Sequence, residues 1–281
     1  MIGLAHLVWA PLGPEPLRDF LRSYHAHPAG AEHELAIVLN GVGPKGPADG
    51  SSREALLAEL EGTEHRLIEL ERPTLDLAAY GQAAHRLTHE KLCFLNSYSV
   101  VLVDGWLERL ADALEHPDVG LVGASASWES QAEWIRGRAR HWPQQLARLP
   151  RARGDYPRFP NPHIRTTAFM LNRLALVEMA LEQAADKRAT YLLESGRRSI
   201  TRRIQEQGSR VAVVGRDGQA YDVEGWPASR TFRSGDQENL LVADNQTQDY
   251  QTASSRRRRR LARDSWGVSG RLLDAPQSSE H

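Results

Sequence analysis

The sequence contains one cysteine and three lysines in 281 residues, and each scarcity narrows what the protein can be. A single thiol, Cys93, cannot form an intramolecular disulfide framework or a cysteine-cluster zinc site. The basic residues are almost all arginine, a bias that fits either a GC-rich genome or bidentate binding of phosphate. Because 35 basic residues nearly balance 36 acidic ones, the chain is neither a globally basic nucleic-acid binder nor a strongly acidic disordered protein.

Long apolar runs are also missing, since none approaches the ~18 residues that a transmembrane helix requires. The amino-terminal residues lack the basic region of a signal peptide and reach Pro11 too early for one. Hydrophobic residues make up 41% and charged residues 25% of the chain, which is ordinary for a folded soluble protein. We therefore expect a soluble, cytoplasmic protein.

Short apolar runs alternate with amphipathic stretches along the first half of the chain. The runs at 3–9, 35–39, 66–70, 91–95 and 119–123 have the length and composition of buried strands. The segments between them carry apolar residues at helical spacing. This β-α-β-α order predicts an α/β fold with a mostly parallel central sheet flanked by helices on both sides.

The alternation is less regular in the second half of the chain. A strand is expected at 167–171, a helix at 174–185 and a last strand at 211–214. The segment 235–251 is dense in Asn, Gln and Asp, and it either closes over a bound molecule or packs on the edge of the sheet. The sequence does not choose between these two interpretations.

Small or polar residues follow the expected strands at their carboxyl ends, where ligands bind in open α/β sheets. They are Pro11, Asn40, Gly41, Asp76, Asn96 and Ser97. Side chains of this kind suit contacts with a nucleotide or a sugar, although loops are polar in most proteins. The carboxyl edge of the sheet is therefore the predicted binding site.

Gly41, Gly43 and Gly46 form a G-x-G-x-x-G pattern after the second strand, so a nucleotide-dependent oxidoreductase is one interpretation. The dinucleotide fingerprint requires a helix that begins inside the motif, with its amino terminus on the pyrophosphate. Pro44 and Pro47 interrupt such a helix here. The residues therefore favour a flexible loop over a dinucleotide site.

Several segments occur in an order that resembles a known enzyme family. They are LAIVLNG (35–41), DLAAYGQAAHRL (76–87), KLCFLNSYSVVLVDGWLERLADAL (91–114), VGLVGAS (119–125), HIRTTAFMLNR (163–173) and LLESGRRSITRRIQEQG (192–208). Together they resemble family 2 glycosyltransferases, which have the GT-A fold. The resemblance implies a Rossmann-like donor half at about 1–127, an acceptor half at about 128–250, and an Arg-rich, partly disordered extension at 251–281.

The resemblance also implies roles for individual residues. Glu194 stands in the position of the carboxylate that acts as general base in an inverting transfer, and Asp104 is a second candidate carboxylate. Asp76 and Tyr80 stand where the family has a helix that enters the donor pocket. We expect Glu194 at the start of a helix, where the dipole stabilises a carboxylate, although acidic residues are also common there for structural reasons alone.

The sequence departs from the family at the metal site. Asn96, Ser97 and Tyr98 stand where the family has an Asp-X-Asp motif that holds a divalent cation on the donor diphosphate. Asn and Ser are weak ligands for Mn²⁺ or Mg²⁺, so dependence on such a cofactor is in doubt. Other groups must then balance the charge of the leaving diphosphate, and the candidates are His163, Arg165, Arg197 and Arg198.

Residues 256–260 are five consecutive arginines, followed by Leu261 and Trp266. A run of like charges is most often a solvated segment. It also suits peripheral contact with the anionic inner face of a membrane, with the two apolar residues on the lipid side. Nucleic acid is the least favoured partner, and none is expected.

The sequence thus predicts an enzyme that transfers a sugar from a nucleotide-sugar donor to a hydroxyl acceptor with inversion. The resemblance implies a role in cell-envelope polysaccharide or glycolipid synthesis, with a glycan or glycolipid as acceptor. The main alternative is a non-catalytic GT-A-like binding or assembly module, which the missing Asp-X-Asp motif favours.

Overall fold

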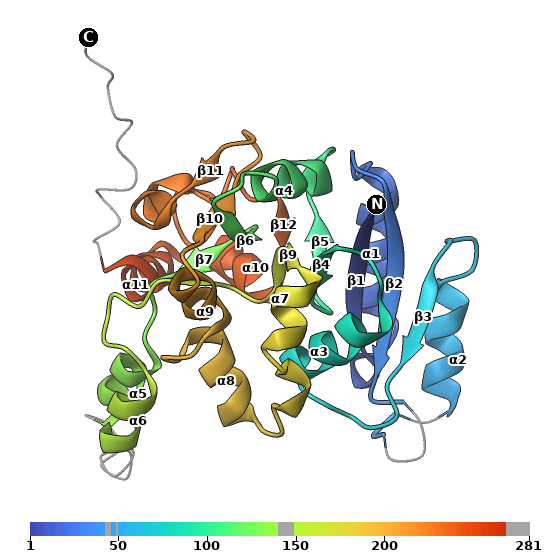
Figure 1. The fold of residues 1–281 in the computed structure, drawn as a ribbon, viewed down its shortest axis with the longest axis horizontal. Helices are drawn as coiled ribbons and strands as arrows, with labels where there is room; N and C mark the ends of the chain where they lie inside the picture. The colour runs from blue at the N-terminus through green and yellow to red at the C-terminus, as the bar shows by residue number, and fades with distance from the viewer. Residues whose placement is uncertain (43–45, 49, 140–148, 268–281) are drawn as a thin grey trace.

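The protein is described by a computed structural model that covers residues 1–42, 46–48, 50–139 and 149–267. Within these residues, the main element is an eight-stranded sheet (Figure 1). Its strands are β1 (Ile2–Trp9), β2 (His33–Asn40), β3 (Arg66–Glu69), β4 (Lys91–Leu95), β6 (Val119–Gly123), β9 (Ala168–Asn172), β10 (Arg210–Val214) and β11 (Ala220–Tyr221). Their order is β11-β10-β6-β9-β4-β1-β2-β3.

Most neighbouring strands are parallel. β1 pairs in parallel with β2 and β4, β2 with β3, and β6 with β10. The exceptions are β9, which is antiparallel to β4 and β6, and the edge strand β11. β1 is buried along nearly its whole length, as expected of a strand covered on both faces. The predicted α/β fold with a mostly parallel central sheet flanked by helices is confirmed.

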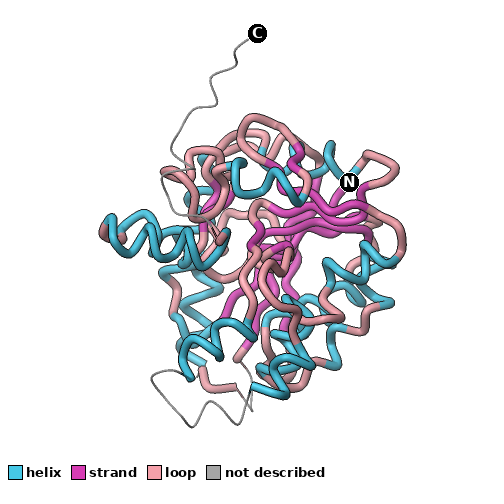
Figure 2. Tube along the Cα trace, turned by 90° about the vertical axis from the view of Figure 1, so that its left-hand side faces the viewer, coloured by secondary structure: helices cyan, strands magenta, loops and turns pink. Residues whose placement is uncertain are grey.

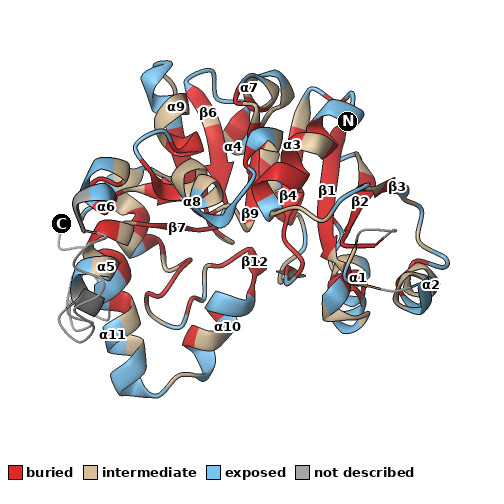
Figure 3. Cartoon of the chain, turned by 90° about the horizontal axis from the view of Figure 1, so that it is seen from below, coloured by how far each residue is buried: buried red, intermediate tan, exposed pale blue. Residues whose placement is uncertain are grey.

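Helices lie on both faces of the sheet, whose strands run through the middle of the molecule (Figure 2). They are α1 (Glu15–Ala26), α2 (Gly50–Glu59), α3 (Asp76–Arg86), α4 (Trp106–Leu114), α5 (Gln131–Ala139), α6 (Leu149–Asp155), α7 (Arg173–Glu178), α8 (Lys187–Ser195), α9 (Ile200–Glu206), α10 (Asn245–Thr252) and α11 (Ser255–Trp266). Phe20 of α1 and Trp106 of α4 pack in one core, and Leu77 of α3 and Ile204 of α9 pack in the other. The two cores lie on opposite faces of the sheet, so its central strands, such as β1 and β4, are mostly red in Figure 3.

Smaller elements complete the fold around the carboxyl edge of the sheet. In the described part of the chain, 3-10 helices occur at η1 (Ala10–Leu12), η3 (Leu181–Gln183) and η4 (Val223–Ser229). β5 (Val100–Val101) pairs with β12 (Val242–Ala243), and β7 (Ala126–Ser127) pairs with β8 (His163–Ile164). These pairings join segments that are distant in sequence, and they fix the second half of the chain against the first.

The reversed strand β9 determines what stands at the carboxyl edge of the sheet. Because β9 runs opposite to β4, its first residues lie beside the last residues of β4, as shown by the pairing of Ala168 with Leu95. The backbone of the preceding Thr167 accepts a hydrogen bond of 2.9 Å from the N–H of Asn96. The threonines before β9 therefore lie next to the residues that follow β4.

The helix predicted at 174–185 is wrong in its extent. α7 ends at Glu178, and Ala180 has a φ of 52°, which breaks the helical conformation. The chain then forms the short η3 and starts α8 at Lys187, after Asp186 has capped it. The reason is local, because Asp186 accepts a hydrogen bond of 2.7 Å from the N–H of Ala189 and favours a new helix start.

The carboxyl-terminal segment, predicted as an Arg-rich, partly disordered extension at 251–281, packs on the body of the protein as far as residue 267. Trp266, at the end of α11, is 2% exposed, and its indole N–H donates a hydrogen bond of 2.8 Å to the backbone oxygen of Phe232. Its ring also contacts Trp128 edge to face. The predicted disorder concerns residues 268–281, which lie outside the described residues. None of the described helices is both long and apolar enough to span a membrane.

Candidate functional site

A cavity of about 270 Å³ opens at the carboxyl edge of the sheet. It is lined by Leu75, Asp76, Asn96, Tyr98, Thr166, Thr167, Lys187, Thr190, Tyr191, Glu194, Asn245 and Gln246. These residues come from the start of α3, the end of β4, the start of β9, one face of α8 and the start of α10. The cavity adjoins the point where the strand order reverses between β1 and β4, which is where open α/β sheets bind ligands.

Two carboxylates share this cavity. Asp76 is the first residue of α3 and is exposed to solvent, and Glu194 lies across from it on α8. The surrounding protein keeps water from part of the Asp76 carboxyl, and this desolvation raises its pKa. The negative charge of Glu194 raises the pKa further. On the opposite side, the hydroxyl of Thr166 donates a hydrogen bond of 3.1 Å to Oε1 of Glu194. The two carboxylates are therefore close enough to interact, and one of them is oriented by a hydrogen bond.

Glu194 lies at the carboxyl-terminal end of α8, so its expected place at a helix start is wrong. α8 begins at Lys187, and Glu194 is two turns further on. The negative end of the helix dipole does not stabilise a carboxylate, which leaves the Thr166 hydroxyl as the polar partner shown by the structure. Lys187, Thr190 and Tyr191 line the same cavity because residues three, four and seven apart share one helix face.

Asn96 and Ser97 hold the backbone of the loop that follows β4. Oδ1 of Asn96 accepts hydrogen bonds of 3.1 Å from the N–H of Tyr98 and 3.0 Å from the hydroxyl of Ser99. The hydroxyl oxygen of Ser97 accepts a bond of 3.0 Å from the N–H of Trp9, at the end of β1. Asn96 still lines the cavity, but both side chains, predicted to bind the donor, are first of all structural.

Asn40 and Gly41, at the end of β2, have structural roles too. The Asn40 side chain donates to the oxygen of Thr74 at 2.8 Å and accepts from its N–H at 3.1 Å, which fixes the loop before α3. Gly41 has a φ of 89° and lies against the Trp9 ring, where a Cβ would be 2.9 Å from a ring carbon. Pro11, in η1, is exposed. None of these three predicted donor residues lines the cavity.

The G-x-G-x-x-G interpretation is not supported by the position of the nearest helix. Gly43 lies outside the described residues, while Gly41 and Gly46 are described. α2 begins at Gly50, beyond the motif. A dinucleotide fingerprint would require the helix to begin inside the motif, so its amino terminus is not where a pyrophosphate would need it.

Tyr80 and Asp104 are not where the sequence predicted. Tyr80 is fully buried, with its ring 4.8 Å from that of Phe94 and 5.7 Å from that of Phe169, so it belongs to the core and not to a donor pocket. Asp104 is exposed beyond the end of β5 and forms a contact of 2.7 Å with Nδ1 of His27. Asp104 does not line the cavity, and α4 is preceded by Gly105 as its cap.

His163 and Arg165, expected near a diphosphate, are buried beside the cavity. Nδ1 of His163 donates a hydrogen bond of 2.8 Å to the backbone oxygen of Asn161, and burial lowers the pKa of the imidazole. Arg165 donates 2.6 Å to Oδ2 of Asp244 and 3.1 Å to the hydroxyl of Ser125. Neither side chain lines the cavity. The positive charge of Arg165 instead balances the negative charge of the buried Asp244 carboxylate.

Asp244 connects this ion pair to the cavity wall. Burial alone would raise its pKa, but the charge of Arg165 and hydrogen bonds from the protein outweigh that effect and hold the pKa below its ordinary value. The carboxylate also accepts from the N–H groups of Gln246 and Thr247 at 2.9 and 2.8 Å, which caps α10. The first residues of α10, Asn245 and Gln246, are thereby held in the cavity wall.

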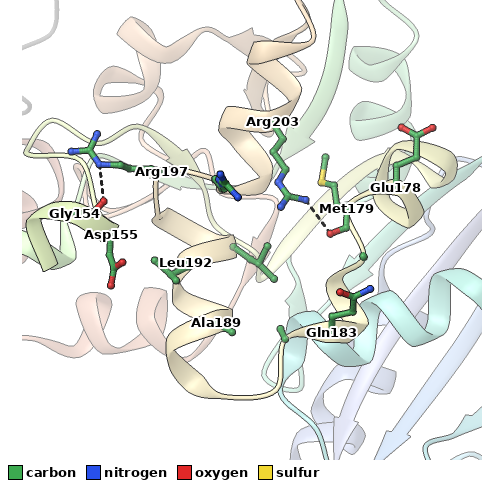
Figure 4. A pocket seen from close by; sticks show the side chains of 13 residues that line it. Gly154, Asp155, Glu178, Met179, Gln183, Ala189, Leu192, Arg197 and Arg203 are labelled. Atoms are coloured by element: carbon green, nitrogen blue, oxygen red, sulfur yellow. Dashed lines mark hydrogen bonds between the residues drawn. The ribbon is translucent and has the colours of Figure 1, made fainter. Parts of the chain in front are cut away.

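Arg197 and Arg198, the remaining phosphate candidates, line a different cavity (Figure 4). It lies between α7, η3, α8 and α9, and neither arginine is among the residues around Asp76 and Glu194. Both follow α8 directly in sequence, on the turn to α9. The sequence order placed them near Glu194, but the end of α8 directs them to the other side of the helix.

The residues at the Asp-X-Asp position do not fit a divalent cation. Oδ1 of Asn96 and Oγ of Ser97 already accept hydrogen bonds from the protein, and the third residue is Tyr98. Mn²⁺ and Mg²⁺ prefer carboxylate oxygens, which are absent at these three positions. In the described part of the chain, His, Cys, Asp and Glu side chains form no group of three or more that could hold a metal ion.

Sequence reasoning missed the most conspicuous side chains of the cavity, two exposed aromatic rings. Tyr98 is 38% and Tyr191 is 44% exposed, whereas most aromatic rings of the described chain are buried. Tyr rings expose a flat apolar face and a polar tip, which suits stacking against a base or a sugar ring. Tyr98 follows β4 directly, which is a usable signal, but Tyr191 and Lys187 come from a helix that the sequence pattern did not show.

Comparisons with known proteins place the chain near several solved folds. No family model matches this sequence, and no curated protein sequence matches it. The mannosyltransferase PcManGT from Pyrobaculum calidifontis, in complex with GDP-Man and Mn²⁺, is 15% identical with a TM-score of 0.46, over 82% of this chain and 59% of that one. The galactosyltransferase LgtC, in complex with donor and acceptor sugar analogues, is 11% identical with a TM-score of 0.44, over 75% and 73% of the two chains.

S. aureus TarS, residues 1–349, is 8% identical with a TM-score of 0.45, over 80% of this chain and 60% of that one. The chain thus spans less than two thirds of the length of both TarS and the mannosyltransferase. Because all three TM-scores are below 0.5, the activity of this chain has to be inferred from its own residues.

Proposed function

We propose that the protein is a glycosyltransferase of the family 2 type that transfers a sugar from a nucleotide-sugar donor to a hydroxyl acceptor with inversion. The observation that carries the proposal is the pair Asp76 and Glu194 in one cavity at the carboxyl edge of the sheet. Two interacting carboxylates can divide the work of acid-base chemistry and of binding hydroxyl groups. Tyr98 and Tyr191 supply aromatic faces beside them.

In this proposal Glu194 is the general base. Its carboxylate takes the proton of the acceptor hydroxyl while that oxygen forms a bond to the anomeric carbon of the donor sugar. The bond from that carbon to the diphosphate breaks on the opposite face, and the nucleoside diphosphate leaves with the bonding electrons. The hydrogen bond from Thr166 orients Glu194 for this proton transfer. Asp76 accepts hydrogen bonds from hydroxyl groups of the donor.

Lys187 is the group that we propose for the charge of the leaving diphosphate. It is exposed on the first turn of α8, it lines the cavity, and no carboxylate of the described residues forms an ion pair with it. A positive charge near the breaking bond stabilises the transition state more than the ground state. Lys187 thus takes the role first considered for His163, Arg165, Arg197 and Arg198.

The acceptor and its setting remain part of the same proposal: a glycan or glycolipid in cell-envelope synthesis on the cytoplasmic side. α11 supports a peripheral membrane contact there. Arg257 pairs with Asp249 and Arg258 with Asp236. The other arginines of this helix, Arg256, Arg259, Arg260 and Arg263, are exposed and have no ion pair within the described residues. Their spacing gathers them on one side of the helix, where they suit an anionic lipid surface.

A thermal-shift screen with UDP-, GDP- and dTDP-sugars first identifies the donor, because a ligand at ~100 times its dissociation constant adds ~2.7 kcal/mol of stability. Glu194→Gln should then abolish transfer and leave donor affinity within a few-fold. Glu178→Gln, which removes an exposed carboxylate outside the cavity, is the matched control and should transfer at the wild-type rate. Normal turnover by Glu194→Gln would exclude Glu194 as the base.

The second candidate function is a non-catalytic binding or assembly module. One observation favours it: Asn96 and Ser97 accept hydrogen bonds from backbone N–H groups. In the family that the sequence resembles, the residues at this position bind the metal instead. Binding and turnover assays with the donor identified in the screen distinguish the two functions. Donor binding without transfer to any glycan or lipid acceptor supports the module, and measurable turnover supports the enzyme.

A further inference from the structure

A second cavity, of about 650 Å³, lies on the other side of α8 from the two carboxylates, and Figure 4 shows the side chains that line it. Ala189, Leu192 and Leu193 of α8 line it, and none of them lines the smaller cavity. At 3.6 residues per turn these positions lie on the face opposite Tyr191 and Glu194. Pockets that bind small organic molecules have volumes of about 300–1,000 Å³, and this cavity falls within that range.

Three arginines bring positive charge to this cavity. Arg197 donates hydrogen bonds of 3.0 and 3.2 Å to the backbone oxygens of Gly154 and Arg153. Arg203 donates 3.0 Å to the backbone oxygen of Met179, at the end of α7. Arg198 is exposed and has no hydrogen bond or ion pair within the described residues. Two guanidinium groups are thus anchored by uncharged carbonyls, and all three keep N–H donors for a ligand.

The acidic residues of the cavity do not neutralise these arginines. Both carboxylate oxygens of Asp155 accept hydrogen bonds from Arg188, at 2.7 and 3.0 Å, so its charge is already balanced. Glu178 is exposed and forms no ion pair with any described residue. Three guanidinium groups against one unpaired carboxylate leave a positive excess, which favours an anionic ligand.

Apart from Gln183, the rest of the lining is apolar. Met179, Ala180 and Ala184 come from the segment between α7 and α8, and Leu192 and Leu193 come from α8. Met179 and Ala184 are buried, and the two leucines are half-buried, so the cavity offers an apolar wall beside the guanidinium groups. Apolar walls with a few placed charged groups are characteristic of sites for organic ligands.

We propose that this cavity is a second binding site, for an organic phosphate whose phosphate group is bound by Arg198 and Arg203, while Arg197 adds positive charge at the Gly154 end of the cavity. Guanidinium groups match phosphate oxygens with paired N–H donors. The organic part of the ligand packs against Met179 and Leu192. The proposed site is separate from the site of sugar transfer, since the two cavities have no lining residue in common, although α8 contributes to both.

Calorimetric titration of the full chain at fixed ionic strength tests the site, with hexyl phosphate, inorganic phosphate and hexanol as probes. Hexyl phosphate should bind more tightly than inorganic phosphate, and hexanol should not bind. Arg198→Gln should lower the affinity for hexyl phosphate by about tenfold. Arg256→Gln removes one exposed, unpaired arginine of α11 and should leave the affinity unchanged.

Two further variants locate the ligand. Ala189→Phe places a large side chain on the cavity face of α8 and should abolish binding of hexyl phosphate. Asp76→Asn should leave that binding within twofold, because Asp76 belongs to the other cavity. The proposal is overturned if Arg198→Gln binds as the wild type does, if Arg256→Gln loses as much, if inorganic phosphate binds as tightly as hexyl phosphate, or if none of the probes binds at millimolar concentration.

Discussion

The guanidinium of Arg165 donates a hydrogen bond of 2.6 Å to the carboxylate of Asp244, and both side chains are buried. The pair joins the residue after β8 to the residue before α10, across 79 positions of the chain. The same carboxylate accepts a hydrogen bond from the backbone of Gln246, which lines the cavity. One buried ion pair therefore fixes a wall of the proposed active site.

Replacement of Asp244 should strongly destabilise the protein. Asp244→Ala leaves Arg165 as a buried charge without its carboxylate, which costs about 3–5 kcal/mol of unfolding free energy. It also removes the cap of α10. Urea denaturation followed by circular dichroism measures the loss. The control is Asp249→Ala, which breaks the exposed pair with Arg257 and should cost about 1 kcal/mol or less. Equal losses in the two variants would contradict a special role for the buried pair.

The interaction of Asp76 with Glu194 can be measured directly. The negative charge of Glu194 contributes to the raised pKa of Asp76, after the effect of the surrounding protein, which keeps water from part of the carboxyl. Glu194→Gln removes that charge, so the pKa of Asp76 should fall, while the partial loss of water still holds it above the ordinary range. Titration of the Asp76 carboxyl by carbon NMR gives the value. In Glu178→Gln, which changes a carboxylate of the other cavity, the pKa of Asp76 should stay as in the wild type.

The fold was predictable because its strands are continuous apolar runs. Each of the five runs in the first half of the chain became a strand of the sheet, and β4 and β6 are separated only by the reversed strand β9. The direction of β9 is set by tertiary pairing with its neighbours and not by its own residues. Its reversal brings Thr166 to Glu194, a contact that no local pattern could show.

The site was predictable only in part, because a side chain at a strand end can bind either a ligand or the protein's own backbone. Asp76 and Glu194 do share a cavity. Asn40 and Ser97 have the same chemistry as a ligand contact but satisfy backbone groups of neighbouring loops. Arg165 illustrates the limit further, since its partner Asp244 lies in a polar segment whose packing depends on the whole fold.

Chelation of divalent cations should change donor affinity little. The oxygen atoms of Asn96 and Ser97 already accept hydrogen bonds, so the position of the family's metal motif offers no carboxylate. Donor binding measured by calorimetry in EDTA and in Mn²⁺ should agree within a few-fold. A much weaker complex in EDTA would mean that the cavity carboxylates and the donor phosphates hold a cation together.

Removal of an exposed aromatic ring from the cavity should weaken the binding of the nucleotide-sugar. Tyr191 is 44% exposed and lines the cavity, so its ring has an apolar face free for stacking. Stacking of a base on an aromatic side chain contributes about 1–3 kcal/mol, and Tyr191→Ala should therefore raise the donor dissociation constant by about tenfold or more. Leu174→Ala, a change at an apolar side chain that is 60% exposed outside the cavity, should have no effect. An unchanged dissociation constant for Tyr191→Ala would place the donor elsewhere.

His6 should make the stability of the protein depend on pH. The ring lies in β1 with no exposed surface and stacks on Phe20 at 3.7 Å between ring centroids. Among the described residues, neither of its nitrogens has a hydrogen-bond partner. Burial lowers its pKa to about 3. In the unfolded chain the imidazole binds a proton near its ordinary pKa of about 6.5, so between these two values the unfolded state holds more protons than the folded state.

The neutral His6 ring therefore makes its full contribution to the unfolding free energy above about pH 6.5. Between about pH 6.5 and the folded pKa of about 3, the unfolding free energy falls by up to about 1.4 kcal/mol for each pH unit. His6→Phe removes the proton uptake and keeps a flat ring against Phe20. We measure the unfolding free energy by urea denaturation at neutral pH and at about pH 5. The loss between the two pH values should be about 2 kcal/mol smaller in His6→Phe than in the wild type. The same change at exposed His25 should leave the pH dependence intact. If His6→Phe and the wild type lose stability in parallel as the pH falls, the folded protein must protonate His6 or open around it.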